Sequence, residues 1–377
     1  MDNSLNTDLE KSRNNIDSVD FQIVELLARR QTEVDKVLQF KKEHGLPVSH
    51  PAREEDMISR RRNLGGERNL DPDYIEELFR TILRQSRVEQ TESKSEKGIK
   101  SDSTVLIVGG RGGMGRYFSS WFNKSGYKTR ILGSQDWDNV ETLCDGIDLV
   151  LISVPIDKTV SVIERLTPYL PAKAILADLT SIKTEPMQNM MKSHKGPVLG
   201  IHPLFGPATS SMDKQIVVIT PGRSDDACKW VIEQLAEWGA IIVRSNEEEH
   251  DRIMTIVQAL RHFATFTFGR FLSKQNIDLL RSLEFSSPIY RLELGMVGRL
   301  FAQDPALYSG IIFASQERST LIKDYIKSMA ELIDMVDTLN KDEFEKQFRK
   351  IAEWFGPFSE QAMRESSFLI DKLIERF

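Results

Sequence analysis

A glycine-rich turn directly after the apolar run 105–108 constrains the fold of this chain more than any other feature. Gly110, Gly112 and Gly115 give the pattern Gly-x-Gly-x-x-Gly, and helix-like sequence begins near Tyr117. When such a turn joins a strand to a helix, its glycines allow backbone N–H groups and the helix N-terminus to approach a pyrophosphate. The pattern therefore predicts a Rossmann-type dinucleotide-binding domain, and a glycine-rich loop without a ligand is the alternative.

Short apolar runs after Thr104 alternate with amphipathic or turn-rich stretches. They occupy residues 105–109, 128–132, 148–154, 174–177, 198–201 and 215–220. This alternation is typical of βαβ units and predicts an α/β fold with a mostly parallel sheet. Beyond about Asn246 we expect no further strand, and long helices follow to Phe377.

The first quarter of the chain is predicted to be helical. Over about 8–44, apolar residues keep the three- and four-residue spacing of one helical face. They are Ile16, Val19, Ile23, Leu26, Leu27, Val34, Val37 and Leu38. A helix of roughly 50 Å cannot bury such a seam within so small a domain, so we expect it to pair with a second copy of the chain. The other predicted segments are helices over 51–64 and 72–92 and a loop over 65–69.

The composition narrows the class of protein. With 377 residues the chain can form two or three domains. A formal net charge of −6 argues against a nucleic-acid or membrane-surface partner, and no apolar run approaches the ~18 residues of a membrane span. The N-terminus lacks a secretory pattern, and the cysteines, Cys144 and Cys228, have no metal-type partners nearby. We therefore expect a cytoplasmic protein without a metal site.

Two cations lie in register on the apolar face of the first predicted helix. Arg30 and Lys41 are eleven residues apart, which leaves them only about 20° apart around the helix axis. Ile23 and Leu26 lie near the same line. Because an unpaired buried charge is costly, these cations need anionic partners. An internal salt bridge is the alternative for either residue alone.

The N-terminal helices resemble the all-helical chorismate mutases. The matching positions are Arg13, Arg30, Lys41, Arg53, Glu54, Ser86 and Gln90. The resemblance implies an intertwined homodimer in which Arg13 reaches the site of the partner. It also implies that the arginines bind the carboxylates of chorismate, that Lys41 and Gln90 donate to the ether oxygen, and that Glu54 receives the ring hydroxyl. His50 stands where many stand-alone mutase domains carry Asp.

The second strand of a dinucleotide-binding fold is expected to end in an acidic residue that binds the ribose hydroxyls. Gly133 occupies that position here, and Asp136 follows three residues later. No basic cluster replaces the acid, so NAD is the predicted cofactor, with NADP left open. The predicted cofactor-binding residues are Gly110, Arg111, Gly112, Gly113, Met114, Gly115, Asp136, Ser153, Val154 and Pro155.

A histidine ends one of the predicted apolar strands, at the sheet edge where open α/β folds place their ligands. This residue, His202, follows Ser181 by 21 residues. A lone histidine is more often structural than catalytic, but the position favours a function. His44, His194 and His250 lack that context.

These motifs resemble those of the prephenate dehydrogenases. The resemblance implies that His202 bonds the ring hydroxyl of prephenate and that Ser181 orients the histidine. It also implies that Arg299 binds a substrate carboxylate, with His262 and Arg291 as neighbours in the site. A helix arginine without function, or a structural ion pair, is the alternative for both arginines.

With mutase motifs before dehydrogenase motifs, the chain resembles the bifunctional chorismate mutase–prephenate dehydrogenases of tyrosine synthesis. The implied reactions are the pericyclic conversion of chorismate to prephenate, then the NAD-dependent oxidative decarboxylation of prephenate to 4-hydroxyphenylpyruvate. Feedback by tyrosine is implied as well. The expected segments are a helical mutase domain over 1–92, a linker over 93–103, a Rossmann domain over 104–245 and a helical substrate and dimerisation domain over 246–377.

Three other interpretations are open to this sequence. The N-terminal helices of a dehydrogenase could serve only dimerisation or regulation, which would make their cations vestigial. A dinucleotide-binding sensor without activity would not explain why His202, Ser181 and Arg299 occur together. The substrate could be arogenate, or the cofactor NADP, and the sequence separates these poorly.

Overall fold

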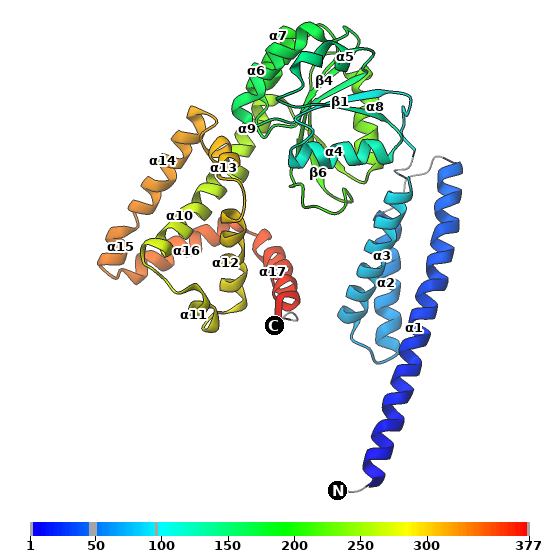
Figure 1. The fold of residues 1–377 in the computed structure, drawn as a ribbon. Coiled ribbons are helices and arrows are strands. Elements are labelled where there is room, and N and C mark those ends of the chain that lie inside the picture. Colours follow the sequence, from blue (N-terminus) through cyan, green and yellow to red (C-terminus); the bar gives the residue numbers. More distant parts are fainter. Residues whose placement is uncertain (1–2, 45–50, 95–96, 375–377) are drawn as a thin grey trace.

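The computed structural model describes residues 3–44, 51–94 and 97–374, and it has three parts in chain order (Figure 1). The N-terminal part is helical, as predicted. Its helices are α1 (Asn3–Glu43), α2 (Pro51–Glu67) and α3 (Pro72–Lys94). With 41 residues, α1 is about 60 Å long. α2 and α3 pack along each other, and α1 packs more sparsely against α3.

The predicted loop over 65–69 is wrong in its first half, because α2 continues through Gly65 and Gly66. A Cβ at Gly65 would lie 2.7 Å from Cγ1 of Ile75 on α3. Glycine here therefore lets two helices approach closely instead of ending one of them. The chain turns later, where Asn69 has a φ of 58°.

The apolar seam predicted on the first helix is not buried within this chain. Ile16, Val19, Ile23 and Leu26 are between 49 and 59% exposed, whereas Leu38, near the end of α1, is 6% exposed. Much of the N-terminal half of α1 projects beyond α2 and α3 (Figure 1). Within the described chain, most of the seam therefore stays open to solvent.

A seven-stranded sheet forms the middle part, with the strand order β2-β1-β3-β4-β5-β6-β7. The strands are β1 (Thr104–Val108), β2 (Lys128–Leu132), β3 (Leu149–Ile152), β4 (Ile175–Asp178), β5 (Val198–Pro203), β6 (Ile216–Pro221) and β7 (Ile241–Arg244). All neighbours are parallel except β5 and β6. The six predicted strands are confirmed. β7 was missed because it is a short edge strand with mostly exposed side chains.

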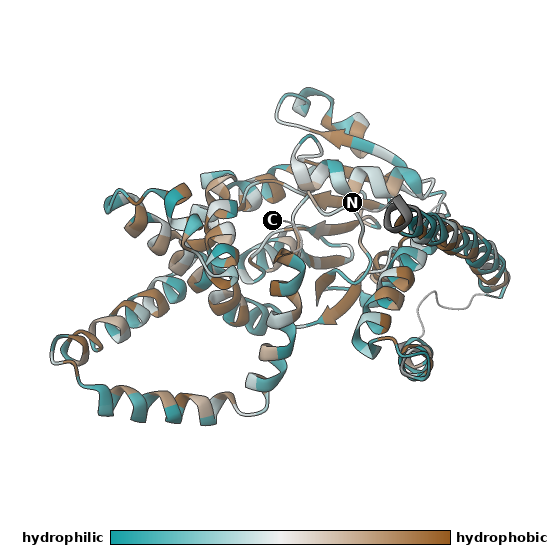
Figure 2. Cartoon of the chain, turned by 90° about the horizontal axis from the view of Figure 1, so that it is seen from below, coloured by the Kyte–Doolittle hydropathy of each residue, from teal (hydrophilic) through white to brown (hydrophobic). Residues whose placement is uncertain are grey.

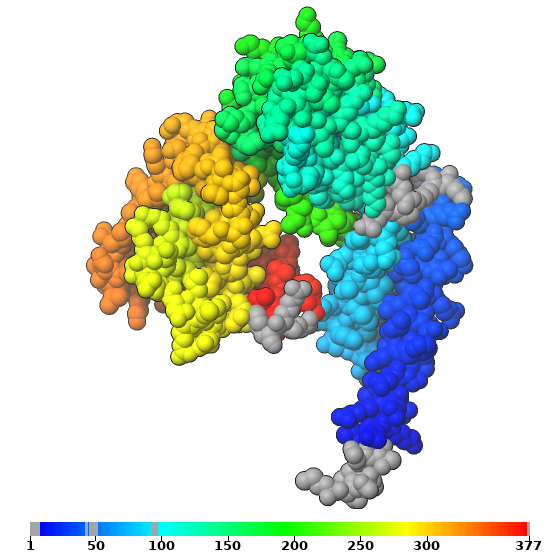
Figure 3. All heavy atoms as spheres, in the orientation of Figure 1, coloured from blue at the N-terminus to red at the C-terminus, as the bar shows by residue number. Residues whose placement is uncertain are grey.

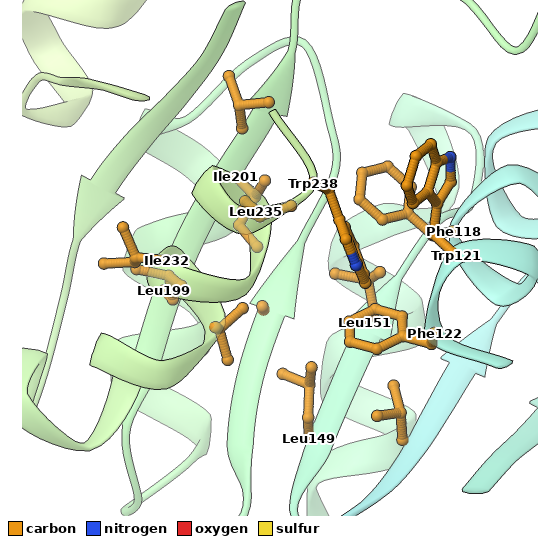
Figure 4. Packing of buried hydrophobic residues seen from close by; sticks show 14 of the residues in the cluster. Phe118, Trp121, Phe122, Leu149, Leu151, Leu199, Ile201, Ile232, Leu235 and Trp238 are labelled. Carbon is orange, nitrogen blue, oxygen red and sulfur yellow. The ribbon is translucent and has the colours of Figure 1, made fainter. Parts of the chain in front are cut away.

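Both faces of the sheet are covered, so successive side chains of β1 enter different cores. Val105 and Ile107 belong to one cluster, and Leu106 and Val108 belong to the other. Figure 4 shows the first cluster, in which aromatic rings from α4 lie beside Trp238. The strands appear as an apolar centre in Figure 2. The flanking helices are α4 (Gly113–Lys124), α5 (Val140–Cys144), α6 (Ile156–Leu166), α7 (Thr184–Ser193) and α8 (Asp225–Glu237).

The C-terminal part is helical from residue 247 onward, as predicted. It comprises α9 (Glu247–Met254), a π-helical segment over Thr255–Leu260, α10 (Arg261–Lys274), α11 (Leu279–Glu284), α12 (Pro288–Phe301), α13 (Pro305–Ile312), α14 (Gln316–Ala330), α15 (Ile333–Asp337), α16 (Lys341–Phe355) and α17 (Phe358–Ile374). Figure 3 shows these helices and the N-terminal helices as two limbs extending from the sheet-containing part. Among the described residues, no helix is both long and apolar enough to span a membrane.

Candidate functional sites

The first candidate site is a pocket between the N-terminal helices, with a volume of about 480 Å³. Its lining includes six of the residues predicted to bind chorismate. They are Arg30, Lys41, Arg53, Glu54, Ser86 and Gln90. Arg30 joins α1 to α3, because its Nη1 donates to Ser86 Oγ at 2.7 Å. Burial, and then the nearby Arg61, lowers the pKa of Arg30. An anion in the pocket would relieve this crowding of positive charge.

One residue predicted for this site, Arg13, lies apart from the pocket. Arg13 is exposed on the projecting half of α1 and does not line the pocket of its own chain. That position is compatible with a role in a second chain. His50 lies outside the described residues.

Arg87 is a pocket residue that the sequence pattern did not reveal. The residue is 9% exposed, and its guanidinium donates through Nη1 to Glu54 Oε2 at 2.7 Å. Its Nε lies 3.4 Å from Oδ2 of Asp213, which belongs to the loop between β5 and β6. Arg87 thus links the pocket to the sheet-containing part. The spacing of Ser86 and Gln90 marked this turn of α3, but nothing in the sequence pointed to Asp213.

The second candidate site begins with the glycine turn between β1 and α4. Gly109 has a φ of 78°, and a Cβ there would lie 2.2 Å from the backbone oxygen of Ser153. A Cβ at Gly115 would lie 2.5 Å from the backbone oxygen of Gly109. Gly112 precedes α4 without a side-chain cap. The free N–H groups of this helix end can therefore bind an anion such as a pyrophosphate.

The other predicted cofactor residues surround this turn. β1 and β3 are adjacent, and β2 lies on the far side of β1, so the sheet reverses its winding between β1 and β3. Residues 153–155 follow β3, and Val154 lies beside Gly109 at this crevice. Met114, at the start of α4, packs against the core. These residues fit a dinucleotide bound across the crevice.

Asp136 lies closer to the end of β2 than its place in the sequence suggests. Its Oδ2 accepts the backbone N–H of Gly133 at 2.7 Å. Arg111 binds the same carboxylate through both terminal nitrogens, at 2.7 and 3.1 Å. A Cβ at Gly133 would lie 2.1 Å from Nη1 of Arg111, so glycine leaves room for this pair. The turn after β2 thereby places the carboxylate of Asp136 at the end of this strand.

His202 lies one residue before the end of β5 and is 2% exposed. Its Nδ1 lies 2.8 Å from Nε2 of His250, and its Nε2 lies 3.2 Å from Nε2 of Gln258. His250 is on α9, whose start is capped by Asn246, and Gln258 is in the π-helical segment that follows. Burial, followed by the positive charge of Lys183, lowers the pKa of His202 well below its ordinary value. The ring is therefore neutral near pH 7.

Asp251 is held rigidly beside His250. Its Oδ1 accepts the backbone N–H of Lys183 at 2.7 Å, and its Oδ2 accepts that of Thr184 at 2.8 Å. His250 Nδ1 lies 2.8 Å from Asp251 Oδ1. Burial alone would raise the pKa of Asp251, but hydrogen bonds from His250, Thr184 and Lys183 lower it to about 2. The carboxylate is thus ionised and acts only as an acceptor.

The loop after β4 is tied down by a fully buried ion pair. Lys183 Nζ lies 2.5 Å from Asp178 Oδ2, and neither side chain is exposed. Lys183 also donates to the backbone oxygen of Thr180 at 2.8 Å. Removing either charge would leave the other uncompensated in the core, so this pair fixes the loop that holds Asp251.

The sequence expectations for Ser181 and His250 differ from the structure. Among the described residues, the side chain of Ser181 makes no hydrogen bond to His202, because His250 occupies the Nδ1 side of that ring. The backbone oxygen of Ser181 instead lies 3.4 Å from Nη2 of the buried Arg318. His250, which sequence context gave no role, contacts His202 directly. Its pairing depends on how α9 packs against β5, which no local pattern encodes.

The predicted substrate residues of the C-terminal part lie on α10 and α12. His262 packs edge-on against Tyr308, and burial lowers its pKa to about 4. Arg291 Nη2 donates to the backbone oxygen of Leu283 at 3.1 Å. Arg299 is exposed, and within the described chain no hydrogen bond or ion pair of its side chain is found. No described contact joins these residues to His202.

Three family models match the chain in succession. Residues 12–91 match chorismate mutase type II, and residues 126–244 match the nucleotide-binding domain of prephenate dehydrogenase. Residues 246–350 match the dimerization domain of prephenate dehydrogenase.

Two relatives match nearly the whole chain. The T-protein of Enterobacter agglomerans is 43% identical over 367 residues, which cover 96% of this chain and 97% of the relative. The T-protein of Haemophilus influenzae is 42% identical over 365 residues, covering 97% of each. A crystal structure of prephenate dehydrogenase from A. aeolicus with hydroxyphenyl propionate and NAD+ has a TM-score of 0.54 and 20% identity. It covers 66% of this chain and 96% of that chain, and this likeness shows the fold alone.

Proposed function

We propose residue roles for this chain, which belongs to the T-protein family and is both a chorismate mutase and a prephenate dehydrogenase of tyrosine biosynthesis. The observation that carries the assignment of roles is the physical separation of two sites. One is the cationic pocket of the N-terminal helices, and the other is the buried histidine centre at the end of β5. We take 1–92, 104–245 and 246–377 as the domains, with 93–103 as the linker.

In the mutase site, the pocket cations would hold chorismate folded. Arg30 and Arg53 bind its carboxylates, and Lys41 and Gln90 donate to the ether oxygen, where negative charge develops as the bond breaks. The reaction moves no proton to the protein, so fixed charges are sufficient. Glu54 receives the ring hydroxyl, and Arg87 holds Glu54 in place.

The dehydrogenase belongs to a family with a nicotinamide dinucleotide-binding domain, and for this chain we propose NAD. The glycine turn and the uncapped end of α4 would hold its pyrophosphate, and Asp136 would bind the ribose hydroxyls. A carboxylate at that position repels the 2′-phosphate of NADP. Arg111 pairs with Asp136 and would have to share it with the ribose.

When bound, the nicotinamide supplies the acceptor for the hydride that leaves the ring carbon bearing the hydroxyl. His202 Nε2 takes the hydroxyl proton as the carbonyl forms. The ring then loses its carboxylate as carbon dioxide, and the electron pair of the broken bond makes the ring aromatic. Arg299 would anchor a carboxylate of prephenate, with His262 and Arg291 nearby.

A homodimer is proposed because the apolar seam of α1 is exposed in one chain. A second α1 on this seam would bring Arg13 of each chain towards the pocket of the other. A family dimerization domain occupies the C-terminal part. Tyrosine as a feedback inhibitor and a cytoplasmic location stay predictions.

A coupled assay tests the whole proposal. The enzyme is given chorismate alone, and prephenate is followed; NAD or NADP is then added, and the reduced cofactor is followed. A parallel assay replaces chorismate with arogenate, and a further one adds tyrosine. We expect prephenate in the first step and faster reduction of NAD than of NADP in the second. If chorismate is not converted, the N-terminal helices serve only dimerisation or regulation.

A further inference from the structure

We propose that His250 and Asp251 are positioning residues that fix the ring tautomer of His202, leaving its Nε2 without a proton. The inference deepens the proposed function, because it rests on His202 as the proton acceptor. The three side chains form one line. Asp251 Oδ1 lies 2.8 Å from His250 Nδ1, and His250 Nε2 lies 2.8 Å from His202 Nδ1.

The direction of the hydrogen bonds along this line follows from Asp251. An ionised carboxylate has no proton to donate, so Nδ1 of His250 must carry the proton of the first bond. A neutral His250 then has a bare Nε2, which can only accept. Nδ1 of His202 must therefore donate, and a neutral His202 is left with a bare Nε2.

The contact on the far side of His202 agrees with this assignment. The amide nitrogen of Gln258, which is a donor, lies 3.2 Å from Nε2 of His202. A bare ring nitrogen is the acceptor that such a donor needs. A substrate hydroxyl that displaces the amide would meet the same lone pair, in the direction required for proton transfer.

The charges around the two rings favour their neutral forms. Lys183 follows β4, and Arg318 is on α14; both oppose a positive charge on His202, as does the neighbouring His250. Asp251 on α9 acts in the opposite sense, and Asp178 on β4 does so for His250. Burial is the largest effect and lowers the pKa of both histidines. With both rings neutral, the position of each proton is set by hydrogen bonding alone.

The position of Asp251 does not depend on His250. Two backbone N–H groups, of Lys183 and Thr184, hold its carboxylate where the loop fixed by the buried Asp178–Lys183 pair meets the start of α7. The carboxylate of Asp251, which sets the direction of these hydrogen bonds, is thus held by backbone groups next to the sheet. α9 places His250 beside this carboxylate. Without this order, His202 could carry its proton on Nε2 and would be unable to accept another.

Two substitutions of His250 separate positioning from packing. His250→Gln keeps a side-chain oxygen that can accept from Nδ1 of His202. His250→Phe keeps a ring of similar size but has no acceptor. We expect His250→Phe to lower the dehydrogenase kcat by ~10²-fold or more, and His250→Gln to stay within about tenfold of the parent. KM for NAD should not change, and mutase turnover reports whether each chain is folded. A packing role predicts the opposite order, and that order would overturn the proposal.

The tautomer itself can be measured without any turnover. The chain has six histidines, so the ring nitrogens of His202 can be assigned in the ¹⁵N-histidine-labelled full chain by comparison with His202→Asn. We expect a protonated Nδ1 and a bare Nε2 in the parent enzyme and in His250→Gln, and a mixture in His250→Phe. A protonated Nε2 in the parent would overturn the proposal even if a variant failed to fold. If His202→Asn instead oxidises prephenate normally, the proposed role of His202 fails, whatever its tautomer.

Discussion

The two sites of this chain use opposite electrostatic designs. In the mutase pocket, cations from three helices surround a space of about 480 Å³. In the dehydrogenase centre, His202 is 2% exposed and is held by side chains from two other elements. The first site is lined by permanently charged groups. The second is closed and keeps its key ring neutral.

The chemistry of each reaction accounts for this difference. A pericyclic rearrangement needs a folded substrate and compensation for charge on one oxygen, and permanently charged groups supply both. The oxidation removes a proton from a hydroxyl, so one group must change its protonation state. Such a group works only if its resting state is fixed, and burial together with a directed set of hydrogen bonds fixes it. Substitutions in the mutase pocket and in the dehydrogenase centre should therefore affect the two activities differently.

The largest effect is expected at His202. His202→Asn removes the ring nitrogen that accepts the substrate proton, and we expect the dehydrogenase kcat to fall by ~10²–10⁴ while mutase turnover is kept. Steady-state rates with prephenate and with chorismate check this. His194→Asn is the matched control, since His194 is also buried but its ring Nε2 lies 2.8 Å from a backbone oxygen, that of Ala174. Parent-like oxidation of prephenate by His202→Asn would make His202 a structural residue.

The converse change is at Lys41. Because Lys41 meets the charge that develops on the ether oxygen, Lys41→Ala should lower mutase turnover by ~10²–10³, with oxidation of supplied prephenate within a few-fold of the parent. Lys36→Ala provides the control on the same helix, because Lys36 is exposed and pairs with Glu33. Equal loss of both activities in a folded Lys41→Ala enzyme would mean that the two reactions share a site.

The residues of the two sites also show how much could be predicted from the sequence. Lys41 and the glycine turn belong to patterns with fixed spacing, on a helix or at a strand end, so residue order alone located them. His250 and Asp213 could not be located in that way. Each acts on a residue far away in the chain, and the contact depends on how separate elements pack. The loop predicted over 65–69 is wrong in its first half for a related reason, because Gly65 allows a close contact with Ile75 on another helix.

Arg299 tests the substrate anchor of the dehydrogenase. A guanidinium can donate two parallel hydrogen bonds to one carboxylate, and this interaction exists in both the ground state and the transition state. We expect Arg299→Ala to raise KM for prephenate by an amount worth ~2–4 kcal/mol, with KM for NAD hardly changed. Because the described chain offers Arg299 no side-chain partner, its melting temperature should be unaffected. Arg270→Ala, at another exposed helix arginine, is the control, and a normal KM would remove Arg299 from the site.

The pH dependence should also separate the two sites. His202 accepts a proton only when neutral, so the dehydrogenase kcat/KM should fall about tenfold for each pH unit below the pKa of that ring. Burial places this pKa well below 6.5, and the acid limb should therefore begin below pH 6.5. Rate profiles for both reactions on one preparation measure this. A limb near or above 6.5 for prephenate oxidation would contradict the burial of His202.

The smallest effect is expected at Asp213, where the sheet-containing part contacts the N-terminal helices. Arg87 lies between Glu54 at 2.7 Å and Asp213 at 3.4 Å, and both ends of the Arg87–Asp213 pair are largely buried. Asp213→Asn removes one charge from Arg87, which then binds Glu54 alone and draws it away from the ring hydroxyl of chorismate. We expect KM for chorismate to rise about two- to fivefold, the effect of one altered hydrogen bond, with prephenate oxidation unchanged.

The control for this coupling is Asp225→Asn, which breaks an exposed pair with Arg244 elsewhere in the same domain. It should change neither activity, because surface ion pairs contribute little. Asp213→Glu, which keeps the charge, should restore most of the chorismate affinity. If Asp213→Asn leaves KM for chorismate at the parent value, Arg87 holds Glu54 without a contribution from Asp213 in the sheet-containing part. The mutase pocket would then be independent of the dehydrogenase at this contact.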